Sequence, residues 1–300
     1  MRVRAVAESD TAEIAALCSD ELILDQDART IPTLLLQRPN VCLVAVRESG
    51  IAGVCIGSRA SVDSENSDAF LDLFVVRRAD QRQGIARQLV GDLERRLASE
   101  GCRRIRIAGN PPRFAWPGID IHYTAAVCFA EDLGYRRGSC EVNMDVDLES
   151  APLDTQADTE RLQREGVQIR PANYNDDGPL QKFLASGWAP SWAAEVTLAL
   201  RGRQGGLFVA CQGSQYVGFC AYGVNRTREV GPIGTASRVR HLGVGRVLLR
   251  RCLAEQRDRG LTAAEIGWVG PLSFFARTVQ AKIGRAFWLY QKDLKHPNGS

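Results

Sequence analysis

The sequence predicts a mixed α/β fold built from two tandem units, each with a mixed central sheet and helices on both faces. Two observations predict it. The length of 300 residues suits two domains at roughly 150 residues each. Three short motifs of the first half also return in the same order in the second half, which indicates a duplication.

The three motif pairs occupy matching places in the two halves. The first pair predicts a strand that runs into a helix N-cap, the second a hairpin, and the third a polar turn between a strand and a long helix. The pairs are Arg4–Asp10 with Arg170–Asp176, Ala52–Cys55 with Val217–Cys220, and Gln81–Ala86 with Arg240–Gly245.

Each half predicts the same order of elements: strand, two helices, hairpin, strand, long helix, strand, helix and a final hairpin. Apolar spacing at Val247, Leu248, Cys252 and Leu253 indicates the second long helix, over 245–257. The expected strands are 3–7, 41–46, 53–58, 70–76, 104–108, pieces near 136 and at 142–146, and then 167–170, 207–211, 217–222, 231–235, 264–268 and 287–292.

A polar stretch near the midpoint predicts the domain boundary. Residues 149–165 contain no aromatic side chain and few large apolar ones, which is typical of a linker. We therefore expect an N-terminal domain over 1–148 and a C-terminal domain over 166–300.

Composition excludes several classes of protein. A net charge of +3 is too small for a general nucleic-acid binder. No apolar run reaches the length of a membrane span, and acidic residues interrupt the N-terminus where a signal peptide would be apolar. We therefore expect neither a nucleic-acid partner nor a membrane partner.

The nine cysteines are scattered, none in a C-x-x-C pattern, and their number is odd. This usage favours a reduced, cytoplasmic protein. With only three histidines and none beside a cysteine pair, the sequence offers no local zinc ligand set, and we expect no metal.

The turns at 81–87 and 240–246 carry the strongest functional signal. Each joins an apolar strand to a long helix, so its backbone N–H groups and the positive end of the helix dipole converge on one point. Gly84 and Gly243 allow a ligand close to the backbone, as do the small residues Ala86 and Gly245 two positions later. The pattern predicts a phosphate or pyrophosphate site. Neither turn is a Walker loop or a Rossmann fingerprint.

This [QR]-x-x-G-x-[GA] pattern between a strand and a helix resembles the acyl-CoA loop of the GCN5-related N-acetyltransferase (GNAT) superfamily. Both halves carry it, so the chain is similar to tandem members of that superfamily such as mycothiol synthase-like proteins. The resemblance implies acetyl-CoA as cofactor, a bulged strand before each turn, and a free strand N–H that polarises the thioester. The implied cofactor residues are Val75, Val76, Gln81, Arg82, Gln83, Gly84, Ile85, Ala86, Arg87, Asn110, Ile233, Thr235, Arg240, His241, Leu242, Gly243, Val244, Gly245 and Arg246.

The resemblance also implies a tyrosine acid in the last helix of a domain, and both halves lack it. Ala130 stands at that position in the first half and Phe275 in the second. Tyr123, near the start of the first-half helix, is a substitute candidate, although a surface or packing role fits it as well.

For a general base the resemblance implies a carboxylate on or near the strand before the turn. Glu229 precedes the second-half strand, and Asp72 lies inside the first-half strand between Phe70 and Phe74. An apolar neighbourhood would raise the pKa of such a carboxyl group and make it a better base near neutral pH. Either residue could instead be a solvated strand-edge acid.

A long aromatic loop, 110–123, separates the fifth strand of the first half from the last helix. We expect Trp116 to form a wall of the acceptor pocket, Asp120 to bind a substrate amine and His122 to relay a proton. The alternative is a structural loop whose aromatic side chains cover the domain junction.

These observations predict an acyl-CoA-dependent N-acyltransferase that transfers an acetyl group to a small-molecule amine. Either both units are catalytic, or one is catalytic and the other degenerate. The alternative is a CoA-binding or regulatory protein that has lost its chemistry, and protein acetylation is a third option. The duplication is compatible with a monomer that acts as a pseudo-dimer or with a homodimer.

Overall fold

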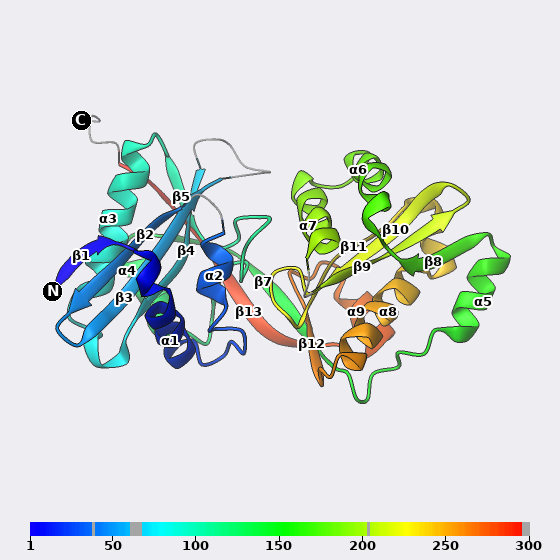
Figure 1. Cartoon of the computed structure of the whole chain (residues 1–300), viewed down its shortest axis with the longest axis horizontal. Coiled ribbons are helices and arrows are strands. Elements are labelled where there is room, and N and C mark those ends of the chain that lie inside the picture. Colours follow the sequence, from blue (N-terminus) through cyan, green and yellow to red (C-terminus); the bar gives the residue numbers. More distant parts are fainter. Residues whose placement is uncertain (38–39, 61–67, 203–204, 296–300) are drawn as a thin grey trace. The chain divides into compact units, whose positions relative to one another are not determined.

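The structure is a computed structural model that describes residues 1–37, 40–60, 68–202 and 205–295. It divides into two compact units (Figure 1). The N-terminal unit consists of residues 1–141 and 287–300, and the C-terminal unit consists of residues 142–286. Each is a mixed sheet with helices on both faces, as the sequence predicts.

In the N-terminal unit the strands are adjacent in the order β1-β2-β3-β4-β5-β13. All pairs are antiparallel except β4 with β5. The strands are β1 (Arg2–Ala5), β2 (Val41–Arg47), β3 (Gly50–Arg59), β4 (Asp68–Val76), β5 (Arg104–Ile107) and, from the C-terminal end of the chain, β13 (Lys282–Asp293), with the short β6 (Ile119–Asp120) beside β13.

Helices cover both faces of this sheet. One core lies beneath the long α3 and the last helix α4, and a second lies beneath α1 and α2. The alternation of buried side chains along each strand supplies both cores. The helices are α1 (Thr11–Glu21), α2 (Ile31–Leu35), α3 (Ile85–Ser99) and α4 (Thr124–Asp132).

The C-terminal unit repeats this plan, with strands in the order β7-β12-β11-β10-β9-β8 and one parallel pair, β11 with β12. Its strands are β7 (Arg136–Asp147), β8 (Val167–Pro171), β9 (Gly206–Gln212), β10 (Gln215–Tyr222), β11 (Glu229–Thr235) and β12 (Ala263–Ile266). Its helices are α5 (Gln156–Arg164), α6 (Asp177–Ala185), α7 (Pro190–Arg201), α8 (Val244–Asp258) and α9 (Leu272–Val279).

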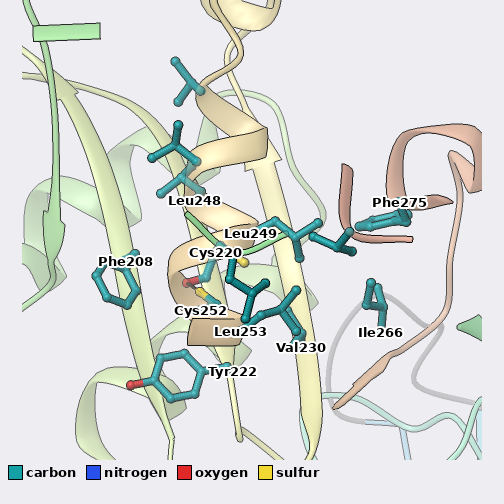
Figure 2. Close-up of a cluster of buried hydrophobic side chains, with 14 of the residues drawn as sticks. Phe208, Cys220, Tyr222, Val230, Leu248, Leu249, Cys252, Leu253, Ile266 and Phe275 are labelled. Carbon is teal, nitrogen blue, oxygen red and sulfur yellow. Dashed lines mark hydrogen bonds between the residues drawn. The ribbon is translucent and has the colours of Figure 1, made fainter. Parts of the chain in front are cut away.

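The long helix α8 packs on one face of this second sheet, and α6 and α7 pack on the other. In Figure 2, Cys252 of α8 lies beside Cys220 of β10, and its thiol donates to the Cys220 carbonyl at 3.3 Å. Gly218 of β10 has no side chain because Leu248 of α8 approaches it closely; a Cβ there would lie 3.0 Å from the leucine. A Cβ added at Gly53 would lie 3.2 Å from Leu89 of α3, which explains why both motifs of the second pair contain a glycine at this position.

Two expectations about chain organisation differ from the structure. The final hairpin of each half is instead one 12-residue strand, β7 or β13. The first part of β7 belongs to the N-terminal unit and its remainder to the C-terminal unit, while β13 divides in the opposite sense. The compact units therefore do not follow the expected division into 1–148 and 166–300.

The segment expected as a linker, 149–165, contains the helix α5. Leu162 of that helix is buried in the core under α8. The residues three and four positions before Leu162 are Thr159 and Asp158, and those after it are Glu165 and Gly166. None of them is a large apolar residue, so Leu162 alone marks the buried face of the helix. Because the sequence of α5 has so little apolar periodicity, it predicts a linker at a place where the structure has a helix.

The first motif pair has a physical explanation in the structure. Arg4 binds the Asp10 carboxylate through two nitrogens, at 2.6 and 2.8 Å, and the Ala7 amide donates to the same carboxylate at 2.7 Å. Arg170 binds Asp176 at 2.8 and 2.6 Å in the same way. Each pair fastens the first strand of a unit to the helix that follows it.

We predict that Asp10→Asn lowers the free energy of unfolding by about 1 to 2 kcal/mol at pH 7, because a bidentate charged pair with a half-exposed arginine is lost. The hydrogen bond from Arg4 lowers the pKa of Asp10 from its ordinary value of 3.8 to about 2. Its stabilisation is thus present above pH 3.8 and disappears as the pH falls through 2. Urea unfolding between pH 7 and pH 2 measures both effects. Glu8→Gln, an exposed neighbour, serves as control, and equal acid sensitivity of the two variants would contradict the prediction.

Candidate functional site

Strand β4 of the N-terminal unit contains a β-bulge at Asp72. Ile56 of β3 lies opposite Leu73, whereas the next residue, Gly57, lies opposite Leu71, so Asp72 is an extra residue on β4. The parallel pairing of β4 with β5 ends at this point, where Leu71 pairs with Ile107. Beyond the bulge, the edge of β4 that faces away from β3 has no partner strand in the described pairings. The bulge expected from the sequence is therefore present, three residues before Val75.

The turn between β4 and α3 is exposed and open. Arg82 and Gly84 have φ angles of 62° and 79°, and a Cβ added at Gly84 would meet nothing within 4 Å. Among the described residues, no acceptor is bonded to the backbone N–H groups of Arg82, Gln83 and Gly84. These N–H groups stand at the start of a 15-residue helix, where an anion is stabilised.

Buried Asp80 holds this turn in place. Its carboxylate lies 3.0 Å from Arg47 and 3.8 Å from Arg77. Gln81 donates from its side chain to the Val76 carbonyl at 3.0 Å. The turn is therefore fixed by side chains beneath it, while the predicted residues from Gln81 to Gly84 are exposed.

The corresponding turn of the C-terminal unit, between β11 and α8, has the same backbone but different surroundings. Gly243 has a φ of 80°, and a Cβ there would lie 3.3 Å from Arg246 and 3.4 Å from Arg161 of α5. Arg161 donates to the Leu242 carbonyl at 2.8 Å. Arg161 also binds the Asp158 carboxylate at 3.2 Å, and Arg246 binds it at 2.6 Å.

Asp158 therefore supplies a negative charge at this turn from within the chain. Burial alone would raise the pKa of Asp158, but the hydrogen bonds from Arg246 and Arg161 outweigh it and lower that pKa. The three side chains lie over the predicted residues Leu242 and Gly243, whereas nothing lies over Gly84 of the other turn.

The two bulged strands differ as well. Gly53 pairs with Val76 in one unit, and Gly218 pairs with Thr235 in the other. When the two glycines are aligned, Val76 therefore corresponds to Thr235, and Phe74 corresponds to Ile233. Asp72 then corresponds to Gly231, which the cis-bonded Pro232 follows. The C-terminal unit thus has a bulge without an acid.

Asp72 is part of a buried polar network in the N-terminal unit. The Ser58 hydroxyl donates to its carboxylate at 2.6 Å, and the Asn110 side-chain amide donates to Ser58 at 2.7 Å and to the Arg59 carbonyl at 2.9 Å. Asp72 is 4% exposed and Asn110 is fully buried. Two residues predicted from separate motifs are therefore joined through Ser58, which the sequence analysis did not single out.

The aromatic loop is anchored on Asp25, which lies between α1 and α2. The Trp116 indole donates to its carboxylate at 2.8 Å, and the Tyr123 hydroxyl donates to it at 3.0 Å. The Leu24 amide donates to the Tyr123 oxygen at 3.1 Å. Trp116 is buried in the core beneath α1 and α2, so it holds the loop against that face. The Tyr123 phenol is engaged with Asp25 rather than directed at solvent.

Asp120 and His122 form an imidazole–carboxylate pair at the end of the same loop. His122 Nδ1 lies 2.8 Å from Asp120 Oδ1, and the His122 amide donates to the same oxygen at 2.8 Å. Asp120 is buried, whereas the His122 side chain is 58% exposed. If Nδ1 carries the proton that Asp120 accepts, Nε2 is the basic nitrogen, as in other carboxylate-oriented imidazoles.

Comparison with known proteins decides the family. Residues 9–115 and 173–272 each match the Acetyltransferase (GNAT) family. The chain belongs to the GNAT family. Both matched segments contain a bulged strand and a Gly-x-Gly/Ala turn, so the chain is a tandem member. No protein in the curated set matches it.

Solved GNAT structures resemble the whole chain. A GCN5-related glucosamine N-acetyltransferase region of a fungal multi-domain GH3 β-N-acetylglucosaminidase has a TM-score of 0.78 at 19% identity; the match covers 97% of this chain and 38% of that one. A tandem GNAT protein from the clavulanic acid biosynthesis pathway has a TM-score of 0.69 at 11% identity, covering 98% of each chain. A GCN5-related N-acetyltransferase from Sphaerobacter thermophilus has a TM-score of 0.66 at 15% identity, covering 98% and 96%. At these identities the likeness shows the fold.

Glu229, the other predicted base of this GNAT protein, lies in a buried charged cluster at the start of β11. It stands opposite Glu265 of β12, which Arg226 binds through two nitrogens at 3.0 and 2.8 Å. Burial raises the pKa of Glu229. Burial alone would also raise the pKa of Glu265, but Arg226 outweighs it and lowers that pKa to about 2. Arg226 balances the charge of Glu265, and the Asn225 amide donates to the Glu229 carboxyl group at 3.3 Å. Pairing and hydrogen bonding are how a core accommodates carboxyl groups.

The position of the usual GNAT tyrosine is a packing position in both units. Ala130 is 1% exposed in the core beneath α3, and Phe275 is 3% exposed in the core beneath α8. Neither side chain has an acidic hydrogen. The described residues contain no cluster of three or more histidine, cysteine, aspartate or glutamate side chains suited to a metal, and no described helix is both long and apolar enough to cross a membrane.

Sequence reasoning missed four polar residues around these sites: Ser58, Asp25, Asp158 and Arg161. Ser58 and Asp25 become important only through contacts with residues 52 and 91 positions away along the chain, Asn110 and Trp116. Asp158 and Arg161 lie in the segment expected as a linker. The only available signal was their spacing of three residues, which places both on one side of a helix.

We predict that Asp25→Ala lowers the free energy of unfolding by about 2 to 3 kcal/mol, because the buried Trp116 indole and the Tyr123 hydroxyl lose their shared acceptor. Urea unfolding followed by circular dichroism measures the change. Asp20→Ala, on the exposed side of α1, is the control. Unchanged stability of Asp25→Ala would show that the carboxylate does not anchor the loop.

Proposed function

We propose that this GNAT protein is an acyl-CoA-dependent N-acyltransferase that uses acetyl-CoA and acetylates an amine of a small molecule. The observation that carries the proposal is the open turn at Gly84, directly after a bulged strand whose edge is free beyond Leu71. The cofactor is assigned to the N-terminal unit, because the matching turn of the C-terminal unit is covered by Arg161, Asp158 and Arg246.

The residues of the β4–α3 turn fit a pyrophosphate. N–H groups without a protein acceptor stand at the start of a long helix, and the missing side chain of Gly84 leaves space in front of them. The exposed side chains of Arg82 and Arg87 add positive charge at the same turn. Acetyl-CoA, when bound, supplies a thioester carbonyl as acyl donor. The N–H groups on the free edge of β4 beyond the bulge, between Leu73 and Val76, would orient and polarise that carbonyl.

In the transfer the amine nitrogen bonds to the acyl carbon, the thioester C–S bond breaks, and CoA leaves as a thiolate that takes up a proton. The attacking amine loses one proton in the same reaction. The proton acceptor that fits is His122, whose exposed imidazole is oriented by buried Asp120. Asp72 is the second carboxylate of the site. Its hydrogen bonds to Ser58, and through Ser58 to Asn110, fix it at the bulge, where it can orient a polar group of the acceptor.

We propose that the activity is cytoplasmic. All nine cysteines are free thiols in the structure, which supports this proposal because thiols remain reduced in the cytoplasm. The acceptor amine and the choice between monomer and homodimer stay predictions.

We predict that Gly84→Glu abolishes acetyl-CoA binding, whereas Gly243→Glu leaves it unchanged. The glutamate would place negative charge against the pyrophosphate site, and any side chain at a φ of 79° costs about 1 to 2 kcal/mol. Isothermal titration of acetyl-CoA into the two variants measures this. Gly84→Ala carries the same backbone strain without the charge and is the control. Retained binding in Gly84→Glu, or loss only in Gly243→Glu, would overturn the assignment.

We predict that His122→Gln lowers kcat by about 100-fold with little change in the KM for acetyl-CoA, because the amine loses its proton acceptor. Steady-state kinetics with a panel of small amines measures both constants, and His241→Gln, an exposed histidine of the other unit, is the control. An unchanged kcat in His122→Gln would exclude His122 from proton transfer. Acetyl-CoA binding without turnover of any amine would favour the regulatory alternative.

A further inference from the structure

The C-terminal unit contains a pocket that the proposed acyl transfer does not use. Its volume is about 590 Å³, within the range of small-molecule sites. It is formed by α6 and the segment after it, by the turn between β9 and β10, and by the end of β11 with the 3-10 helix that follows. The side chains that define its chemistry are Lys182, Phe183, Trp188, Tyr216, Arg238 and Arg240.

Three cations and no carboxylate line this pocket. Arg238 donates to the Gln215 side chain at 2.8 Å, and Arg240 donates to the Thr235 carbonyl at 3.4 Å, so both bind neutral groups. In the described part of the chain, no ion pair joins an acid to Lys182, Arg238 or Arg240. The positive charge of the pocket is therefore not balanced by the protein.

The acid that contacts a side chain of this pocket, Asp176, is already neutralised. Asp176 is bound through two nitrogens by Arg170, and it accepts the Tyr216 hydroxyl at 2.5 Å. These hydrogen bonds, that of Arg170 first, lower the pKa of Asp176 far below its ordinary value. The Tyr216 hydroxyl is thus engaged with Asp176, and the rest of this side chain contributes an aromatic surface to the pocket.

The aromatic side of the pocket is held rigidly. The rings of Phe183 and Trp188 lie 4.6 Å apart, and Trp188 packs edge-on against Phe219 at 5.6 Å. A Cβ added at Gly234 would lie 2.6 Å from the Trp188 indole nitrogen, so the glycine allows the indole to lie directly on β11. Trp188 therefore has one fixed position beside the cations.

We propose that this pocket binds a small phosphate ester that carries a planar ring. The two guanidinium groups and the ammonium group suit a phosphate dianion, and the Phe183–Trp188 wall suits a flat apolar ring. The pocket lies on the α6 and α7 face of the sheet and includes Arg240, the first residue of the β11–α8 turn. Arg161, Asp158 and Arg246 lie farther along that turn, beside Leu242 and Gly243. The inference goes beyond the proposed function, because it gives the second unit a ligand of its own.

The test uses 1-naphthyl phosphate as the probe and the full chain as the protein. Isothermal titration should show one site, and Trp188 fluorescence should change on binding. Lys182→Gln and Arg240→Gln should each weaken binding at least about tenfold, as should Trp188→Leu. Arg257→Gln, an exposed arginine on α8, should not. Inorganic phosphate and neutral 1-naphthol should each bind at least about tenfold more weakly than the ester, and 0.5 M salt should weaken only the charged ligands.

Several results would overturn the inference: no binding of the ester, equal binding of ester and inorganic phosphate, or unchanged affinity in all three pocket variants. Gly84→Glu separates this inference from the proposed function. That variant should bind the naphthyl ester like wild type although it has lost acetyl-CoA. Competition between acetyl-CoA and the ester in Gly84→Glu would show that the pocket is a second acetyl-CoA site and would also overturn the inference.

Discussion

The architecture of both units depends on a short parallel strand pair that stops at a bulge. In the N-terminal unit β4 and β5 pair only from Asp68 to Leu71, and in the C-terminal unit β11 and β12 pair only at Glu229 and Val230. A bulged residue bends its strand and ends regular pairing. The sheet therefore opens beside the strand that leads into the Gly-x-Gly/Ala turn. The turn, the free edge and the helix N-terminus of each unit all follow from that one interruption.

From this common backbone the two copies differ in charge. The N-terminal unit keeps an exposed turn and an acid, Asp72, at the bulge, and it adds the Asp120–His122 pair on the loop after β5. The C-terminal unit has Gly231 at the bulge, while Asp158 and its two arginines occupy the surroundings of its turn. A helix N-terminus attracts an anionic group, and in the second copy the carboxylate of Asp158 lies close to that end of the helix, bound by Arg161 and Arg246. This difference supports the proposal that acyl transfer takes place in the N-terminal unit.

Much of this fold could be predicted from the sequence, because the signals are local. The hairpins, the long helices and both turns follow from apolar periodicity and from glycines at fixed offsets, and the repeat of Arg4 and Asp10 as Arg170 and Asp176 has a local ion pair as its cause. The candidate site was only partly predictable. Asp72 and Asn110 stand out individually, but Ser58 joins them across 52 positions of the chain, and Asp25 meets Trp116 across 91. No pattern within a window of the sequence carries such contacts.

The organisation of the chain was the least predictable feature, and it has a physical consequence for how the units complete their sheets. The strand beside β5 is the last part of β13, with Gln291 opposite Arg106, and the strand beside β12 is the last part of β7, with Met144 opposite Ile266. Residues 1–148 alone would therefore expose the edge of β5, and an exposed edge strand is a site of aggregation. A duplicated chain that exchanges its last strands in this way makes each half depend on the other for a closed sheet edge. The first unit therefore requires β13 from the end of the second copy to pair with β5, whether or not the second copy has a chemistry of its own.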